Sequence, residues 1–126
     1  MTRAMVLLDD DPVMSICIER ALRKTDWELT SFLREELALE HLAHSTPDVL
    51  FVDERLPVRD GHELMQELIK IEHLSKTRLV LFSSVAPPSD VRELVQALGA
   101  TVVSKDIILT PTELLSFLND SPESSS

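Results

Sequence analysis

The chain has 126 residues, of which 44% are hydrophobic and 27% charged, which is ordinary for a single globular domain. Its formal net charge of −10 argues against a nucleic-acid surface, because neutralising phosphates takes clustered Lys and Arg. No apolar run approaches the roughly 20 residues that span a bilayer. Two glycines, Gly61 and Gly99, are too few for a Gly-rich phosphate cradle.

The single cysteine, Cys17, excludes an internal disulfide and suits a reducing compartment. The chain starts at Met1 and runs almost directly into a strand-like segment, so no signal peptide is visible. We therefore expect a cytoplasmic protein with no membrane association. Cys17 lies in an apolar helical pattern, which favours a small core residue over a reactive thiol.

Five short apolar runs, several rich in β-branched or aromatic residues, predict strands. The run at residues 49–52 is apolar throughout and too short for a free-standing helix, which is typical of a strand buried on both faces. The other expected strands cover residues 4–8, 27–32, 79–82 and 101–103.

Helix-start signals and apolar periodicity predict five helices between and after these strands. Asp11 caps the first, which begins at Pro12 and runs to residue 23 or 24; its predicted core stripe is Val13, Ile16, Cys17, Ala21 and Leu22. The next two cover residues 35–44 and 61–71. Ser89 is expected to cap a helix that runs to residue 98 and is ended by Gly99. A capping box at residues 110–113 opens the last helix, which reaches Asn119.

The alternation of strands and helices predicts an α/β fold, a doubly wound five-stranded parallel sheet with helices on both faces. In the flavodoxin-like strand order 2-1-3-4-5, the first and third strands flank the switch point where ligands bind. We expect one domain over residues 1–120. Residues 121–126 are polar and Ser-rich, which predicts a tail or linker.

Chemically active side chains stand directly after four of the five strands. They are Asp9, Asp10, Asp53, Ser83 and Lys105. The carboxyl ends of parallel strands meet at one edge, so these groups can converge. Two like charges about 4 Å apart repel by roughly 4 kcal/mol at an effective dielectric of about 20. Neighbouring carboxylates therefore call for a proton or a divalent cation, and an all-oxygen ligand set suits Mg²⁺.

A metal beside a free carboxylate and a fixed ammonium can receive a phosphoryl group. Each residue also has a simpler interpretation. The acids at residues 9–11 could merely favour the positive end of the first helix, and Asp11 is expected to do only that. Taken singly, Ser83 is typical of a turn and Lys105 of a surface. Because acids, a hydroxyl and an ammonium follow four different strands, the combination favours a phosphoryl-binding site over four separate coincidences.

These residues resemble the receiver domain of bacterial two-component signalling. The resemblance covers about residues 4–119 and rests on the acidic run at residues 9–11, the segment at 47–53, Pro57, Asp60-Gly61, Ser83 and Lys105. It implies that Asp53 accepts a phosphoryl group from a sensor histidine kinase or phosphotransfer protein. It also implies that Asp10, Asp53 and the backbone carbonyl of Arg55 coordinate Mg²⁺, supported by Asp9, while Ser83 and Lys105 hold the phosphoryl oxygens.

The sequence departs from this family at several positions. Asp106 follows Lys105 where proline is usual, and Val102 occupies a switch position that is often aromatic, so an inward-swinging ring cannot carry the signal here. Ser84 replaces the usual Ala, while Arg55 and Val85 occupy positions that tune hydrolysis in the family. The apolar residues 107–109 are expected to pack beneath the last helix. The histidines show no ligand spacing and are assigned to the surface; they are His41, His44, His62 and His73.

Three functional hypotheses remain open from the sequence. The leading one is a phosphorylatable switch that relays its state to an output domain or homodimer partner and turns over no external substrate. The second is a receiver-like interaction module that works without phosphorylation, motivated by the altered switch residues. The third is a haloacid-dehalogenase-type phosphatase with Asp9 as nucleophile, because residues 9–13 also fit that pattern.

Overall fold

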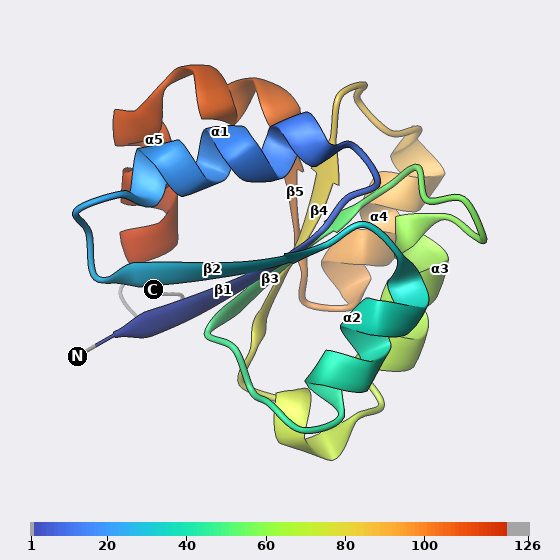
Figure 1. Ribbon diagram of the computed structural model, residues 1–126. Coiled ribbons are helices and arrows are strands. Elements are labelled where there is room, and N and C mark those ends of the chain that lie inside the picture. The colour runs from blue at the N-terminus through green and yellow to red at the C-terminus, as the bar shows by residue number, and fades with distance from the viewer. Residues whose placement is uncertain (1, 121–126) are drawn as a thin grey trace.

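The computed structural model describes residues 2–120; the predicted Ser-rich tail at 121–126 lies outside the described residues. Within them, five strands form one parallel sheet in the order β2-β1-β3-β4-β5, which confirms the predicted fold class (Figure 1). The strands are β1 (Arg3–Leu8), β2 (Trp27–Phe32), β3 (Val49–Asp53), β4 (Arg78–Ser83) and β5 (Thr101–Ser104). Each predicted strand is present, and β3 extends one residue further than expected, to Asp53 itself.

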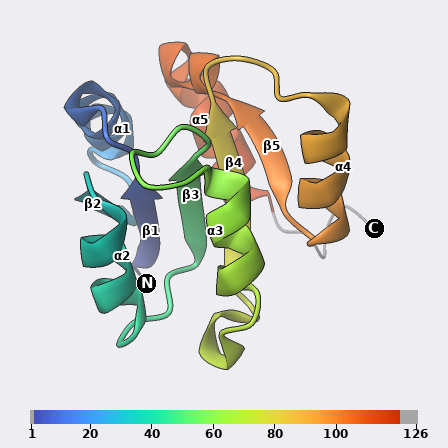
Figure 2. The same ribbon diagram turned by 90° about the vertical axis from the view of Figure 1, so that its right-hand side faces the viewer.

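The helices cover both faces of the sheet, as predicted. They are α1 (Pro12–Leu22), α2 (Glu35–Leu42), α3 (Gly61–Leu68), α4 (Ser89–Ala97) and α5 (Pro111–Asn119). Helices α1 and α5 lie on one face, and α2, α3 and α4 lie on the other (Figures 1 and 2). None of these helices is long and apolar enough to cross a membrane.

The alternation of side chains along each strand builds one core on each face. Phe51 and Phe82 belong to the layer beneath α1 and α5. Val52 and Leu81 belong to the layer beneath α2, α3 and α4. Because β3 is buried along its whole length and β1 from Met5 onward, the residues there contribute to one layer or the other. The same alternation fixes the side of the sheet to which each strand-end residue points.

The helix caps follow the sequence only in part. Asp11 caps α1 as predicted, since its carboxylate accepts a hydrogen bond from the Val13 N–H at 3.0 Å. The prediction for Ser89 is wrong, because it is the first residue of α4 and Pro88 occupies the cap position. The Thr110 hydroxyl binds the Glu113 carboxylate at 3.0 Å and makes no hydrogen bond to the helix backbone, so the predicted capping box does not form.

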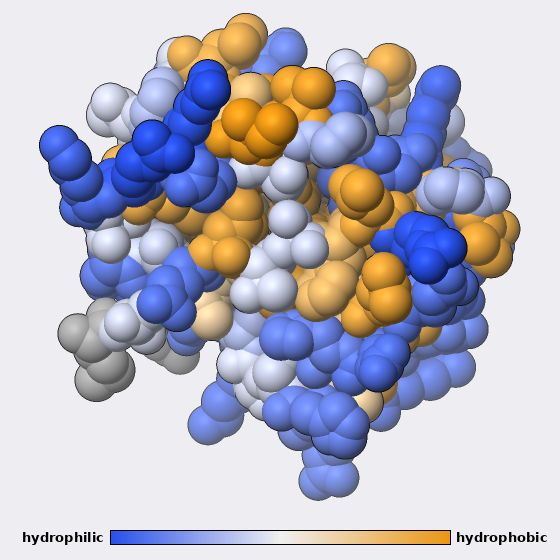
Figure 3. All heavy atoms as spheres, viewed as in Figure 1, coloured by the Kyte–Doolittle hydropathy of each residue, from blue (hydrophilic) through white to orange (hydrophobic). Residues whose placement is uncertain are grey.

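The predicted core stripe of α1 is partly wrong. Val13 and Ile16 are 52% and 49% exposed, whereas Ile18 and Leu22 are buried and Cys17 is half-buried. The helix carries apolar residues around more than one face, and the sheet and α5 cover the stripe that includes Ile18 and Leu22. Apolar side chains consequently reach the surface over this part of the molecule (Figure 3).

A 3-10 helix, η2 (Lys105–Leu109), connects β5 to α5, and another, η1 (Glu72–Leu74), precedes β4. Ile107 and Ile108 pack against the core beneath α1 and α5, as predicted. Leu109 does not, being 75% exposed, so the expectation that the whole apolar run packs is wrong at its last residue. A 3-10 helix has three residues per turn, so three successive side chains point in three directions and cannot all face the core.

The two glycines provide a matched test of how tightly the loop after β3 packs. A Cβ at Gly61 would collide with the backbone carbonyl of Asp53, whereas a Cβ at Gly99 would meet nothing within 4 Å and is disfavoured only by a φ of +83°. We expect Gly61→Ala to lose about 3 kcal/mol or more of unfolding free energy, through overpacking against rigid backbone. Gly99→Ala should lose roughly 1–2 kcal/mol.

Urea unfolding gives both free energies, and backbone amide NMR locates the disturbance. Gly61→Ala should shift the amides of Asp53 and Glu54, while Gly99→Ala should leave them in place. A Gly61→Ala variant as stable as the parent, with unmoved amides at these residues, would contradict this packing.

Candidate functional site

Three carboxylates and an ammonium meet at the carboxyl edge of the sheet. One oxygen from each of Asp9, Asp10 and Asp53 lies within 4.8 Å of the other two. The Lys105 Nζ lies 2.8 Å from Asp9 Oδ2 and 3.2 Å from Asp53 Oδ1. The structure thus brings together four of the residues that the sequence singled out, from β1, β3 and the segment after β5.

Strand alternation explains why these particular groups converge. Leu7 and Phe51 point toward α1 and α5, so Asp9 and Asp53, each two residues further on, point to that side as well. Val103 lies in the same layer, and Lys105 follows it by two residues. Asp9 and Asp53 are only 2% and 4% exposed, whereas Asp10 is exposed at the rim.

Ser83 ends β4 at the same edge of the sheet, and its hydroxyl is bonded within the loop that follows. It is paired in register with Ser104, and its neighbour Phe82 is the residue that points toward α1 and α5. The Ser83 hydroxyl donates to the carbonyl oxygen of Val85, in the loop before α4. Ser83 therefore lines a cavity of about 290 Å³, together with Val85, Arg92, Val102, Ser104 and Asp106 among others. No aromatic side chain lines this cavity within the described residues.

The environment of Asp53 perturbs the pKa of its carboxyl. Burial, followed by the nearby charge of Asp9, raises the pKa of Asp53 to about 6, against the opposing effect of Lys105 and the Arg55 N–H. Burial disfavours the charged form of Lys105, yet Asp9 and Asp53 outweigh this effect and hold its pKa above the ordinary value. The site is therefore a region of concentrated negative charge with one fixed counter-charge.

Asp9 tests whether this site fits a cation. Its Oδ1 accepts a hydrogen bond from the Asp11 N–H at 2.9 Å. Its Oδ2 is fully buried and faces the Lys105 ammonium without an aligned hydrogen bond. A buried carboxylate oxygen left in this state, beside two further acids, fits a hard divalent cation, which binds oxygen ligands and usually keeps several waters.

The loop after β3 is closed on itself and tied to its surroundings. The Arg55 N–H donates to Asp53 Oδ1 at 3.2 Å, and Arg55 forms an isolated antiparallel bridge with Asp60. The Gly61 N–H donates to the Glu54 carbonyl at 2.9 Å. Arg59 binds Glu35 at 2.9 Å and Glu67 at 2.6 Å, and these two carboxylates raise its pKa. The backbone around Asp53 is consequently held from both ends of the loop.

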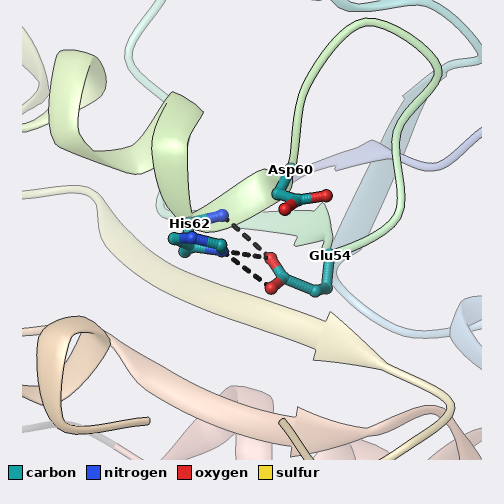
Figure 4. Close-up of side chains that lie close together, drawn as sticks. All are labelled: Glu54, Asp60 and His62. Atoms are coloured by element: carbon teal, nitrogen blue, oxygen red, sulfur yellow. Dashed lines mark hydrogen bonds and ion pairs between the residues drawn. The ribbon is translucent and has the colours of Figure 1, made fainter. Parts of the chain in front are cut away.

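One group of side chains was missed by the sequence reasoning. His62 Nδ1 lies 2.7 Å from Glu54 Oε2, and Asp60 lies beside them (Figure 4). The assignment of His62 to the surface is therefore wrong, since it is half-buried in an ion-pair geometry. His41 is half-buried too, against Phe32. The sequence did contain the information that places Glu54. Because it follows Asp53 directly, strand alternation points its side chain to the other side of the sheet.

Comparison with known proteins identifies relatives of the whole fold and of part of the sequence. A model of the response regulator receiver domain matches residues 5–119. The chain is 39% identical over 69 residues to the DNA-binding transcriptional regulator NtrC of Escherichia coli K12, which is 54% of this chain and 15% of NtrC. The chain thus matches only a small part of this curated relative.

Two solved structures illustrate the shared fold. The chemotaxis response regulator CheY4 of Vibrio cholerae superposes with a TM-score of 0.81 at 19% identity, covering 94% of this chain and 97% of CheY4. The Mn²⁺-bound response regulator Rcp1 gives 0.76 at 20% identity, covering 94% and 96%. Such identities show the fold alone. With the family match spanning nearly all described residues, this chain belongs to the response regulator receiver domain family of two-component systems.

Proposed function

We propose that Asp53 accepts a phosphoryl group from the phosphohistidine of a sensor histidine kinase or phosphotransfer protein, and that the chain relays this state to an output domain or partner. The observation that carries the proposal is the ion pair of Lys105 with both Asp9 and Asp53 at the switch point of the sheet. It leaves a carboxylate nucleophile next to a cation able to neutralise incoming phosphoryl oxygens.

The transfer needs little chemistry beyond positioning. A carboxylate oxygen of Asp53 attacks the phosphorus, the P–N bond to the donor imidazole breaks, and the imidazole leaves with its electron pair. Lys105, already 3.2 Å from Asp53 Oδ1, follows the charge onto the phosphoryl oxygens. Ser83 can donate a hydrogen bond to them only after its hydroxyl leaves the Val85 carbonyl.

Mg²⁺ is the cofactor that we propose for this step. Asp10, Asp53 and the backbone carbonyl of Arg55 would hold it, with Asp9 in support, and it would neutralise charge that develops on the transferred group. The buried Oδ2 of Asp9 and the clustered acids support this assignment. The structure of Rcp1 is that of its Mn²⁺-bound form, and Mn²⁺ is another divalent cation that suits oxygen ligands.

Two alternatives are less well supported by the geometry. A phosphatase reaction through Asp9 would leave no role for Asp53, which lies in the same acid cluster and pairs with the same Lys105. A module that works without phosphorylation would have no use for the Asp53–Lys105 pair. For the output, NtrC is named a DNA-binding transcriptional regulator, and an attached effector domain is one partner that we propose.

Replacing the acceptor tests the function directly. We expect the parent chain, incubated with Mg²⁺ and acetyl phosphate, to gain one phosphoryl group, seen as an increase in intact mass. Asp53→Asn should gain none, because an amide cannot attack phosphorus. The matched control is Asp11→Asn, an exposed cap residue where Asn caps equally well. Phosphorylation that survives in Asp53→Asn would refute the proposal. If it survives there and is lost in Asp9→Asn, the nucleophile is Asp9 instead.

The raised pKa of Asp53 makes stability depend on pH. A carboxyl whose pKa is about 6 in the folded state, against 3.8 ordinarily, binds its proton more tightly when folded. This group therefore lowers stability as the pH rises from about 4 to about 6, by up to about 3 kcal/mol. We expect Asp53→Asn to raise the melting temperature at pH 7 in a chelator, by removing that charge.

The gain should shrink at pH 4, where Asp53 is largely protonated in the folded state. Adding Mg²⁺ at pH 7 should raise the melting temperature of the parent but not of Asp53→Asn. Differential scanning calorimetry at both pH values checks these expectations, with Asp11→Asn as the control. An Asp53→Asn variant less stable than the parent at pH 7 without metal would contradict them.

A further inference from the structure

A second group of side chains that could bind a metal ion lies next to Asp53, on the other side of β3. One donor atom from each of Glu54, Asp60 and His62 lies within 4.8 Å of the other two (Figure 4). His62 Nδ1 is 3.0 Å and 2.7 Å from the two carboxylate oxygens of Glu54. The Glu54 and His62 side chains are only 15% and 18% exposed, so they are not scattered on the surface.

The strand geometry separates this group from the acids around Asp53. Val52 packs beneath α3, so Glu54, two residues further on, points toward α3 as well. Asp53 points to the opposite face, toward α1 and α5. An ion held by Glu54 and an ion held by Asp53 would therefore have different side-chain ligands, although the two residues are adjacent in sequence.

The backbone around these side chains is fixed before any ion arrives. The Gly61 N–H donates to the Glu54 carbonyl, and the His62 N–H donates to the Glu54 carboxylate at 3.0 Å. The Asp60 N–H is held by the Glu63 carboxylate at 3.2 Å. The three side chains thus sit at the two ends of one closed loop, with their donor atoms already close together.

The donor set selects a class of cation. Two carboxylates and an imidazole nitrogen suit borderline first-row ions such as Zn²⁺ and Co²⁺, whereas Mg²⁺ prefers oxygen alone. We propose that Glu54, Asp60 and His62 form a binding site for a divalent transition-metal ion, distinct from the Mg²⁺ site proposed at Asp53. The proposal does not depend on phosphorylation of this chain.

Isothermal titration calorimetry tests the site: Zn²⁺ is titrated into the chelator-washed chain with saturating Mg²⁺ present. We expect one Zn²⁺ per chain. His62→Gln and Asp60→Asn should each weaken binding at least about tenfold, since even changes to residues behind a metal's ligands cost that much. Asn retains the capping ability of Asp60, so that variant separates ligation from helix capping. Co²⁺ should give a visible d–d absorption spectrum that is lost in His62→Gln.

Two controls make the outcome decisive. His73→Gln removes a histidine whose Nε2 binds the Leu42 carbonyl, and it should leave Zn²⁺ binding unchanged. Asp53→Asn should abolish Mg²⁺ binding and retain the Zn²⁺ site. If Zn²⁺ is lost in Asp53→Asn but kept in His62→Gln, the ion occupies the Asp53 pocket and the proposal is wrong. A parent chain that binds no Zn²⁺, or a His62→Gln chain that binds it equally well, would also overturn it.

Discussion

The ion pair between one half-buried ammonium and two buried carboxylates is the constraint on which the site depends. The buried Asp9 and Asp53 carboxylates would repel each other without a counter-charge, and the Lys105 ammonium lies within 3.2 Å of both. The lysine comes from beyond β5, so the pocket requires β1, β3, β4 and β5 to be assembled in order. The proposed chemistry therefore depends directly on the strand order of the sheet.

The sequence predicted the sheet and the acid cluster well, for a physical reason. Central strands of a parallel sheet are apolar along their whole length, so their ends are sharply marked by the first polar residue. Asp9 and Asp53 come at the ends of such runs, and Lys105 directly follows the edge strand β5. Their convergence follows from the rule that parallel strands end at one edge, and no side-chain geometry was needed to find it.

Other features depend on information that a list of strand ends does not contain. Ser83 was placed among the phosphoryl-binding groups, yet its hydroxyl is committed to Val85, because its side of the sheet is set by strand alternation. The stripe of α1 was ambiguous because apolar residues surround much of that helix. The pairing of Glu54 with His62 depends on how the intervening loop returns, which is set by Gly61 and by the bonds of Arg59 to two helices.

The position of Ser83 has a consequence for how the proposed phosphorylation of Asp53 would affect the rest of the fold. The acids face one helical layer, while Ser83 and Val102 belong to the layer that holds α4. Any event that draws the hydroxyl toward the acids must free the carbonyl of Val85 and loosen the segment leading into α4. We infer that the Ser83–Val85 contact, in which the hydroxyl donates to the Val85 carbonyl and accepts from the Val85 N–H, is the link through which a change at the acids would reach α4.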